Sequence, residues 1–199
     1  MAKIIPGKSG SKKDVITLKA SRLFKEKGFP ATSMRDIAEA IGVEAPSLYN
    51  HIESKNGILI DICFRIAHLF TNNLREVELI NESNLFKIKS IIRFHISMMI
   101  EEYESVYISD HEWRHLPEPF LVDYKTKRRG YRNRLAAIIQ KGIDKKEIWS
   151  LNPHVAVLTI LSAIGGLEGW QRSGKKIEEK QIEETMVKIL IGGLQYKPG

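Results

Sequence analysis

The apolar side chains recur at a helical spacing from the start of the chain onward. Ile16, Ala20, Leu23 and Phe24 stand at positions i, i+4, i+7 and i+8, which is one face of a helix with 3.6 residues per turn. Gly28 follows, in the position where a glycine commonly ends a helix. The pattern therefore predicts a first amphipathic helix that stops at residue 28.

Three more helix starts follow in quick succession. Ser33, with Asp36 three residues later, has the arrangement of a capping box, and Gly42 ends the short helix that it begins. A third helix begins near Pro46, because proline suits a first turn. Ser54 then caps a fourth helix, whose apolar residues keep the helical period to residue 70.

Longer helices are expected beyond residue 75. Their predicted spans are 86–107, 121–142, 152–172 and 178–191. There is no glycine between Gly57 and Gly130, which argues against the frequent turns of a sheet. The expected fold is all-α, with an N-terminal three-helix domain over residues 1–57 and a C-terminal helical domain over residues 58–199.

Composition and charge narrow the class of protein. Of the 199 residues 43% are hydrophobic and 28% charged, as in a soluble globular protein, and no apolar run reaches the roughly 20 residues of a membrane span. Residues 1–13 lack the apolar core of a secretory signal, and the single Cys63 fits a reducing cytoplasm. Of the formal net charge of +7, +4 lies in residues 1–60, which points weakly to nucleic acid.

The two short helices joined at Gly42 form a helix-turn-helix pattern. The apolar residues expected to hold them together are Ile37, Ala38, Ile41 and Leu48. The third helix then turns its polar face outward, and that face carries Ser47, Tyr49, Asn50 and His51. Such side chains suit base edges and phosphates, so this surface is the candidate DNA-binding site.

The chain resembles the TetR family of one-component regulators in the order and spacing of four segments: Thr32–Ala38, Ile41–Val43, Ser47–Ile52 and Ser54–Lys55. The resemblance covers about residues 12–60, and beyond them only helical layout and length agree. It implies a homodimer with an N-terminal DNA-binding domain and a C-terminal ligand-binding and dimerisation domain. The DNA contacts that it implies are Arg35, Ser47, Tyr49, His51 and Lys55, with a basic arm of Lys8, Lys12 and Lys13.

Other features of this segment keep plainer interpretations open. Pro46 and the pair Asn56-Gly57 depart from the residues usual in the family. Tyr49 could pack against the first helix, and Lys55 could be an ordinary solvated lysine. The N-terminal lysines could form a solubilising tail instead of a specific arm.

The second domain offers an effector site. Six of the ten residues from Lys125 to Arg134 are basic, which makes either a solvated face or a site for phosphate or carboxylate. The chain resembles the acyl-CoA-responsive branch of the family in three places: the pair Trp113-Arg114, the helix 124–134 and the segment 169–172. This resemblance implies an acyl-CoA effector. The candidate effector contacts are Phe94, Met98, Tyr103, Trp113, Arg114, Tyr124, Arg128, Tyr131 and Arg132, although aromatic residues at helical spacing are more often plain core.

The last two helices are the expected dimer interface. Small residues follow one side of the span 152–172 and would let another helix approach closely: Ser162, Gly165, Gly166 and Gly169. The last helix would add Ile182, Met186, Ile189 and Leu190 to a four-helix interface. The alternative is that these residues are buried inside the monomer.

One catalytic motif is present. His111-Glu112-Trp113-Arg114-His115 matches the H-E-x-x-H pattern, in which one helix presents two zinc-binding histidines and a glutamate base. Pro117 and Pro119 follow at once, so the helix would end there. A zinc-dependent hydrolase at residues 111–115 is therefore the alternative to the regulator.

Taken together, these patterns favour a cytoplasmic, ligand-responsive repressor over an enzyme, and they call for no cofactor. The expected partners are a palindromic operator in double-stranded DNA, a small-molecule effector and a second copy of the chain. Two recognition helices would then enter successive major grooves about 34 to 36 Å apart.

Overall fold

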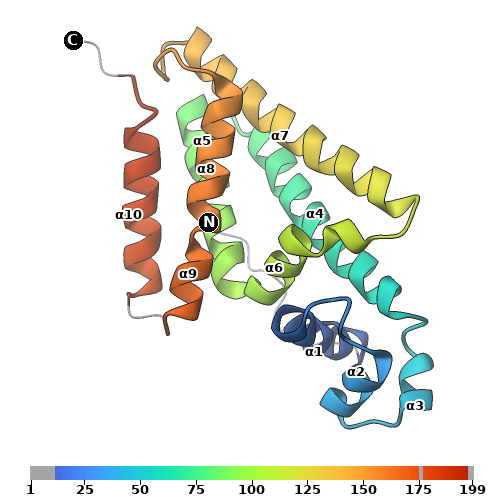
Figure 1. Cartoon of the computed structure of the whole chain (residues 1–199). Helices are drawn as coiled ribbons and strands as arrows, with labels where there is room; N and C mark the ends of the chain where they lie inside the picture. The colour runs from blue at the N-terminus through green and yellow to red at the C-terminus, as the bar shows by residue number, and fades with distance from the viewer. Residues whose placement is uncertain (1–11, 175–176, 197–199) are drawn as a thin grey trace.

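The computed structural model describes residues 12–174 and 177–196, and the fold within these ranges is built from helices (Figure 1). The first four are α1 (Lys12–Lys27), α2 (Met34–Ile41), α3 (Ala45–Tyr49) and α4 (Lys55–Leu79). The others are α5 (Asn84–Glu101), α6 (Tyr103–His111), a 3-10 turn (Trp113–His115), α7 (Phe120–Asp144), α8 (Pro153–Gly165), α9 (Leu167–Arg172) and α10 (Glu179–Gly192). The described residues form no strand, and the expected all-α fold is confirmed.

The boundaries of the first helices follow their local signals. Gly28 and Gly42 adopt positive φ values of 84° and 80°, a conformation that glycine reaches without strain, and each ends a helix. The Ser33 hydroxyl accepts the backbone N–H of Asp36, whose carboxylate accepts the backbone N–H of Ser33, so the capping box is confirmed. Ser54 caps α4 by accepting the N–H of Gly57 at 3.0 Å.

The helices enclose two apolar cores, and α4 belongs to both. Ile58 and Ile62 of α4 lie in the core that α1, α2 and α3 enclose, while Ile66 and Leu74 lie in the core of the larger helical body. Side chains of the body also enter the first core, among them Ile108, Leu116 and Tyr124. The two parts of the chain are thus joined by shared packing as well as by the polypeptide.

Two predicted helices are interrupted. The span 86–107 is wrong as one helix, because the chain turns at Glu102, where φ is −118° and ψ is 28°. The turn lets α5 pack against α7 and α10 while α6 packs against α1 and α4, and Arg65 of α4 donates to the Glu102 carboxylate at 2.8 Å. The span 152–172 is likewise divided, into α8 and α9 at Gly166.

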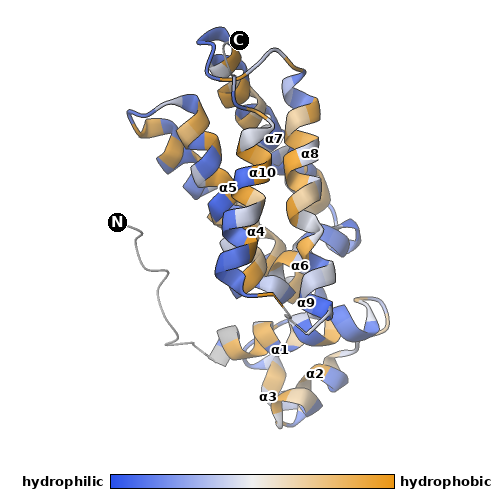
Figure 2. Cartoon of the chain, turned by 90° about the vertical axis from the view of Figure 1, so that its left-hand side faces the viewer, coloured by the Kyte–Doolittle hydropathy of each residue, from blue (hydrophilic) through white to orange (hydrophobic). Residues whose placement is uncertain are grey.

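The helices are arranged around α4, which runs from the α1–α3 unit into the body beside α5 and α7 (Figure 1). Helices α8 and α10 form the opposite side, and hydrophobic residues are visible along α8 (Figure 2). No helix in the described ranges is long and apolar enough to span a membrane.

Candidate functional site

The helix-turn-helix exposes the polar side chains that the sequence singles out. Leu48 is buried and anchors α3, so Ser47, Tyr49 and the two residues after the helix, Asn50 and His51, face outward. Arg35, in the first turn of α2, is exposed as well. Tyr49 is 53% exposed, so it does not pack into the first core. Contact of these side chains with DNA remains a prediction.

Lys55 has a different environment from the other candidates. Its ammonium donates to three backbone oxygens in the turn between α1 and α2, those of Phe29 (2.8 Å), Pro30 (3.2 Å) and Thr32 (2.7 Å). It also lies 4.5 Å from the centre of the Phe29 ring. An ammonium has three hydrogens, so these acceptors satisfy it completely. Lys55 is therefore not a solvated lysine, and its role as a phosphate contact stays a prediction.

The basic arm falls mostly outside the described structure. Lys8 and the side chain of Lys12 lie outside the described residues. The Lys13 ammonium lies 2.6 Å from the Asp61 carboxylate of α4. That ion pair links α1 to α4 near the helix-turn-helix.

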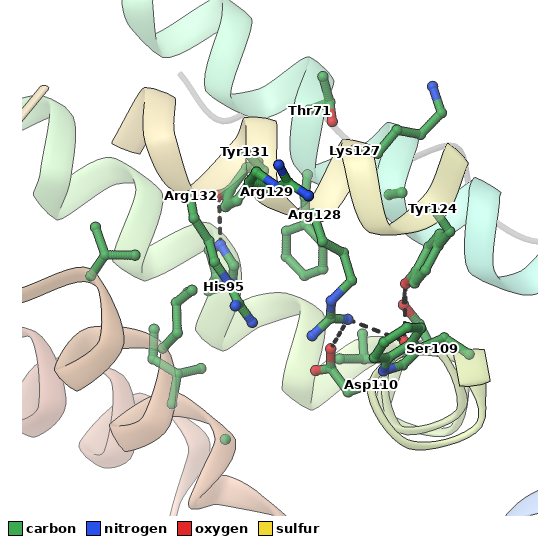
Figure 3. A pocket seen from close by; sticks show the side chains of 18 of the residues that line it. Thr71, His95, Ser109, Asp110, Tyr124, Lys127, Arg128, Arg129, Tyr131 and Arg132 are labelled. Atoms are coloured by element: carbon green, nitrogen blue, oxygen red, sulfur yellow. Dashed lines mark hydrogen bonds and ion pairs between the residues drawn. The ribbon is translucent and has the colours of Figure 1, made fainter. Parts of the chain in front are cut away.

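A cavity of about 820 Å³ lies among α4, α5, α6, α7 and α8 (Figure 3). This volume is in the range of small-molecule sites. The candidate effector residues that line it are Trp113, Arg114, Tyr124, Arg128, Tyr131 and Arg132. The structure therefore brings six of the nine candidates to one place.

Three candidates do not line the cavity. Met98 is almost completely buried in the second core, and Phe94 packs edge-on against Phe70 with ring centres 5.8 Å apart. Tyr103 follows the turn at Glu102 and faces α1, where the Lys25 ammonium lies 4.6 Å from its ring centre. The sequence predicts an uninterrupted helix through residue 103, whereas the turn at Glu102 places Tyr103 outside the site.

Several lining residues are not among the nine candidates. They include Phe70 and Thr71 of α4, His95 and Met99 of α5, Asp110 of α6, and Leu158 and Leu161 of α8. Their approach depends on how five helices pack, which periodicity does not encode. His95 alone carried a signal, as a polar residue on an otherwise apolar stretch of its helix.

The basic run of α7 divides into a paired and an unpaired part. Arg128 is half-buried and donates to the Asp110 carboxylate at 2.8 Å (Figure 3). Lys125, Arg129 and Arg132 are exposed, line the cavity, and make no ion pair or hydrogen bond with any residue of the described ranges. This helix thus brings uncompensated positive charge to the cavity.

Tyr124 forms the buried end of the same helix face. Its phenol donates to the Ser109 carbonyl oxygen at 2.9 Å, and the Ser109 hydroxyl lies 2.6 Å from the phenol oxygen. Burial raises the pKa of Tyr124 to about 12, so the phenol is neutral at physiological pH. The neutral phenol and its hydroxyl partner keep α6 and α7 together at one side of the cavity.

The H-E-x-x-H motif does not form a metal site. His111 ends α6, and His115 lies in the 3-10 turn, so the two histidines do not share a helix face. The His111 Nε2 lies 2.6 Å from the Glu168 carboxylate, and His115 stacks on Phe29 at 5.5 Å between ring centres. No group of three His, Cys, Asp or Glu side chains in the described ranges could hold a metal ion. The zinc hydrolase alternative has no support.

The outer side of α8 and α10 is apolar and open. Val155, Leu158 and Ile189 are 57%, 65% and 66% exposed, and a groove of about 390 Å³ lies between the two helices. A Cβ placed on Gly165 or Gly169 would meet no atom within 4 Å. The glycine stripe is therefore not buried inside the monomer. Ile182 of the last helix is buried in the second core, and Met186 and Leu190 are half-buried against it, so of the four expected interface residues of this helix Ile189 is the exposed one.

Comparison with known proteins matches both parts of the chain. A family model described as "Bacterial regulatory proteins, tetR family" matches residues 16–62, and one described as "Tetracyclin repressor-like, C-terminal domain" matches residues 82–194. The HTH-type transcriptional repressor KstR2 of Mycolicibacterium smegmatis is 22% identical, over 100% of this chain and 98% of the relative. The negative transcriptional regulator IcaR of Staphylococcus aureus is 28% identical, over 79% of this chain and 81% of the relative.

Solved structures agree in fold. KstR2 of Mycobacterium tuberculosis, described as a ketosteroid transcriptional regulator, superposes with a TM-score of 0.88 at 20% identity, covering 96% of this chain and 98% of that one. AibR, solved with isovaleryl coenzyme A and operator DNA, gives a TM-score of 0.79 at 23% identity, covering 91% and 98%. The helical arrangement is thus one that known regulators share.

Proposed function

Because the chain belongs to the TetR family of DNA-binding transcriptional regulators, we propose that it acts as a homodimeric repressor in the cytoplasm and leaves its operator when a coenzyme A thioester binds. One observation carries the choice of effector. A single cavity combines aromatic walls with uncompensated cations, and α4, which enters the DNA-binding core, forms part of its wall. AibR, solved with isovaleryl coenzyme A, supports this class of ligand.

The proposed operator contact uses the exposed face of α3. Ser47, Tyr49 and His51 would meet base edges or phosphates in the major groove, and Arg35 would meet the phosphate backbone. Two copies of α3 in a two-fold dimer would reach successive major grooves, which matches a palindromic operator.

The proposed dimer forms through α8 and α10. The exposed apolar residues and the groove between these helices would accept the same helices of a second copy. A Cβ added at Gly169 would meet no atom within 4 Å, so a partner helix can approach closely there.

In the proposed effector complex, Lys125, Arg129 and Arg132 bind the phosphates of coenzyme A, and the acyl group lies against Phe70 and Trp113. Arginine suits this task, because its planar guanidinium binds phosphate with two hydrogen bonds. The thioester would therefore span the cavity from its basic side to its aromatic side.

Effector binding reaches the DNA-binding part through α4 and α6. Phe70 and Thr71 of α4 line the cavity, and Glu104 of α6 lies 3.8 Å from Arg22 and 3.7 Å from Lys25 of α1. In this proposal the dimer has two states, which differ in the positions of these helices and in the spacing of its two α3 helices. A ligand that binds one state more tightly than the other increases the population of that state.

Binding measurements test the effector. Calorimetric titration with coenzyme A thioesters of increasing acyl length should give binding to the wild type, and Arg132→Gln should weaken it by roughly tenfold through loss of a charge-assisted phosphate contact. Lys141→Gln is the matched control, since it removes one positive charge from the same helix outside the cavity. If no thioester binds the wild type, this effector class is wrong.

Operator binding is tested separately. Fluorescence anisotropy with an operator selected from random DNA should show that Tyr49→Ala weakens binding by roughly 1–3 kcal/mol, the usual range for a base contact. Val122→Ala on α7 is the control, since that exposed residue lies outside the helix-turn-helix. Equal affinity for the two variants would contradict the assignment of Tyr49.

A further inference from the structure

Two polar side chains meet in the aromatic part of the cavity. The His95 Nε2 of α5 lies 2.7 Å from the Tyr131 hydroxyl oxygen of α7, and both residues line the cavity (Figure 3). His95 is only 9% exposed and stacks on the Phe70 ring at 4.2 Å between centres, with an interplanar angle of 18°. The pair is thus fixed by aromatic packing at the inner side of the site.

Both members of the pair are neutral. Burial lowers the pKa of His95 to about 3, and burial also raises the pKa of Tyr131. A neutral imidazole carries one N–H and a phenol carries one O–H. The pair therefore has two hydrogens, of which its mutual hydrogen bond uses one.

One hydrogen is left in either tautomer. If Nε2 accepts from the phenol, the N–H at Nδ1 of His95 remains; if Nε2 donates, the O–H of Tyr131 remains. Neither side chain makes a second hydrogen bond to any described residue. The buried side-chain atoms that lack a partner in these ranges belong to Asn73 and Tyr103, so the unpartnered Nδ1 of His95 is not sealed inside the protein.

We propose that this pair selects the effector by donating one hydrogen bond to an oxygen atom on its buried acyl part. The cavity would then favour an acyl group that places a carbonyl or hydroxyl oxygen at His95 and Tyr131 over a hydrocarbon of the same shape. A polar site discriminates in this way because the analogue without the oxygen leaves a buried donor unpaired. The inference rests on the proposed coenzyme A thioester function.

The oxygen has two possible chemical sources. It is either the carbonyl of the thioester itself or a second oxygen farther along the acyl group. A set of three ligands of equal length, which differ only in these two oxygen atoms, tells the two sources apart. These are a saturated acyl-coenzyme A, its thioether analogue without the carbonyl, and the acyl-coenzyme A with an added keto group near its far end.

Calorimetric titration of these ligands tests the proposal. We expect one of two preferences in the wild type, each at least about fivefold in affinity. Either the saturated thioester binds more tightly than its thioether analogue, or the keto ligand binds more tightly than the saturated thioester. The double variant His95→Phe, Tyr131→Phe removes both possible donors while keeping the aromatic rings, and it should reduce that ratio to about one. Met99→Leu is the control, since it changes the cavity wall without changing a hydrogen bond.

The outcomes are distinct. A preference for the thioester over the thioether identifies the thioester carbonyl, and a preference for the keto ligand identifies the second oxygen. Equal binding of all three ligands by the wild type, or the same ratio in the double variant, overturns the inference and leaves the proposed function intact. If the wild type binds none of the three, the coenzyme A thioester class itself is wrong. Thermal unfolding of the double variant verifies that it is folded.

Discussion

At the residue scale, substitution of Lys55 shows whether this residue stabilises the fold or contacts DNA. Its ammonium holds three carbonyl oxygens of the α1–α2 turn. We expect Lys55→Met to lower the free energy of unfolding by about 2 kcal/mol, because hydrogen bonds from a charged group are lost. Urea denaturation measures this loss.

Arg35→Gln gives the matched comparison. Arg35 is exposed in α2, so we expect stability to change by less than about 0.5 kcal/mol. If it meets a phosphate, the slope of log affinity against log salt concentration should fall by about 0.9. Were Lys55→Met to leave stability unchanged and lower that slope instead, Lys55 would be the phosphate contact.

His95 makes stability depend on pH. Its pKa is about 3 in the folded chain against an ordinary value of 6.5, so between these values the unfolded chain binds more protons. The free energy of unfolding must therefore fall as the pH falls through this range. From pH 7 to pH 5 the contribution of His95 is about 2 kcal/mol.

Denaturation at both pH values measures this contribution. We expect His95→Phe to remove most of it, and His68→Gln, which replaces an exposed histidine of α4, is the matched control. An equal pH dependence in wild type and His95→Phe would show that the imidazole is not held neutral by burial.

The residues whose roles can be predicted from sequence are those that interact with near neighbours along the chain. The caps at Ser33 and Ser54 and the stops at Gly28 and Gly42 act within a few positions along the chain, so their spacing reveals them. Lys55 instead bonds to residues 23 to 26 positions away. Its role depends on a fold that no local pattern contains.

At the element scale, two glycines near helix ends should respond to alanine substitution in opposite ways. Gly42 has a φ of 80°, so Gly42→Ala should destabilise the protein by about 1 kcal/mol although its surroundings are open. Gly57 lies in the first turn of α4, where an added Cβ would meet the Ser54 hydroxyl at an ordinary 3.5 Å. Gly57→Ala should therefore stabilise by roughly 0.5–1 kcal/mol. Urea denaturation of the pair checks both signs.

The helix interruptions show what periodicity leaves out. Neither glycine nor proline marks the turn at Glu102, and the apolar period continues on both sides of it. The turn follows from packing, because α5 also contacts α7 and α10 whereas α6 also contacts α1, although both helices lie against α4. Sequence therefore predicts that helices exist there, while tertiary contacts decide where they end.

At the scale of the whole molecule, the open face of α8 and α10 predicts the oligomeric state. We expect Val155→Glu to give a monomer at micromolar concentration, because a charge would be buried in the proposed interface. Its operator affinity should fall by at least about tenfold, since the two half-sites would no longer be bound together. Analytical ultracentrifugation measures the first effect.

Val122→Glu is the control for the dimer. Val122 is 56% exposed on α7, so the same charge enters a similar exposed position away from α8 and α10. We expect this variant to sediment as the wild type does. A Val155→Glu protein that remains dimeric would place the interface elsewhere.

The cavity is the part of the molecule that sequence described least. The basic face of α7 and residues such as Trp113 and Tyr131 were found, because their charge and aromatic character stand out along the chain. Phe70 and Leu161 were not, because each looks like an ordinary core residue. Their place in the wall follows from the relative positions of α4 and α8.

The sharing of α4 between the two cores determines how the chain unfolds. Ile62 packs with the DNA-binding helices and Ile66, one turn later, packs with the body, so melting either core breaks the helix on which the other depends. The chain should therefore unfold in a single cooperative transition. A ligand in the body would then protect the amide hydrogens of α1 from exchange, and α1 excised without the body would have no stable fold of its own.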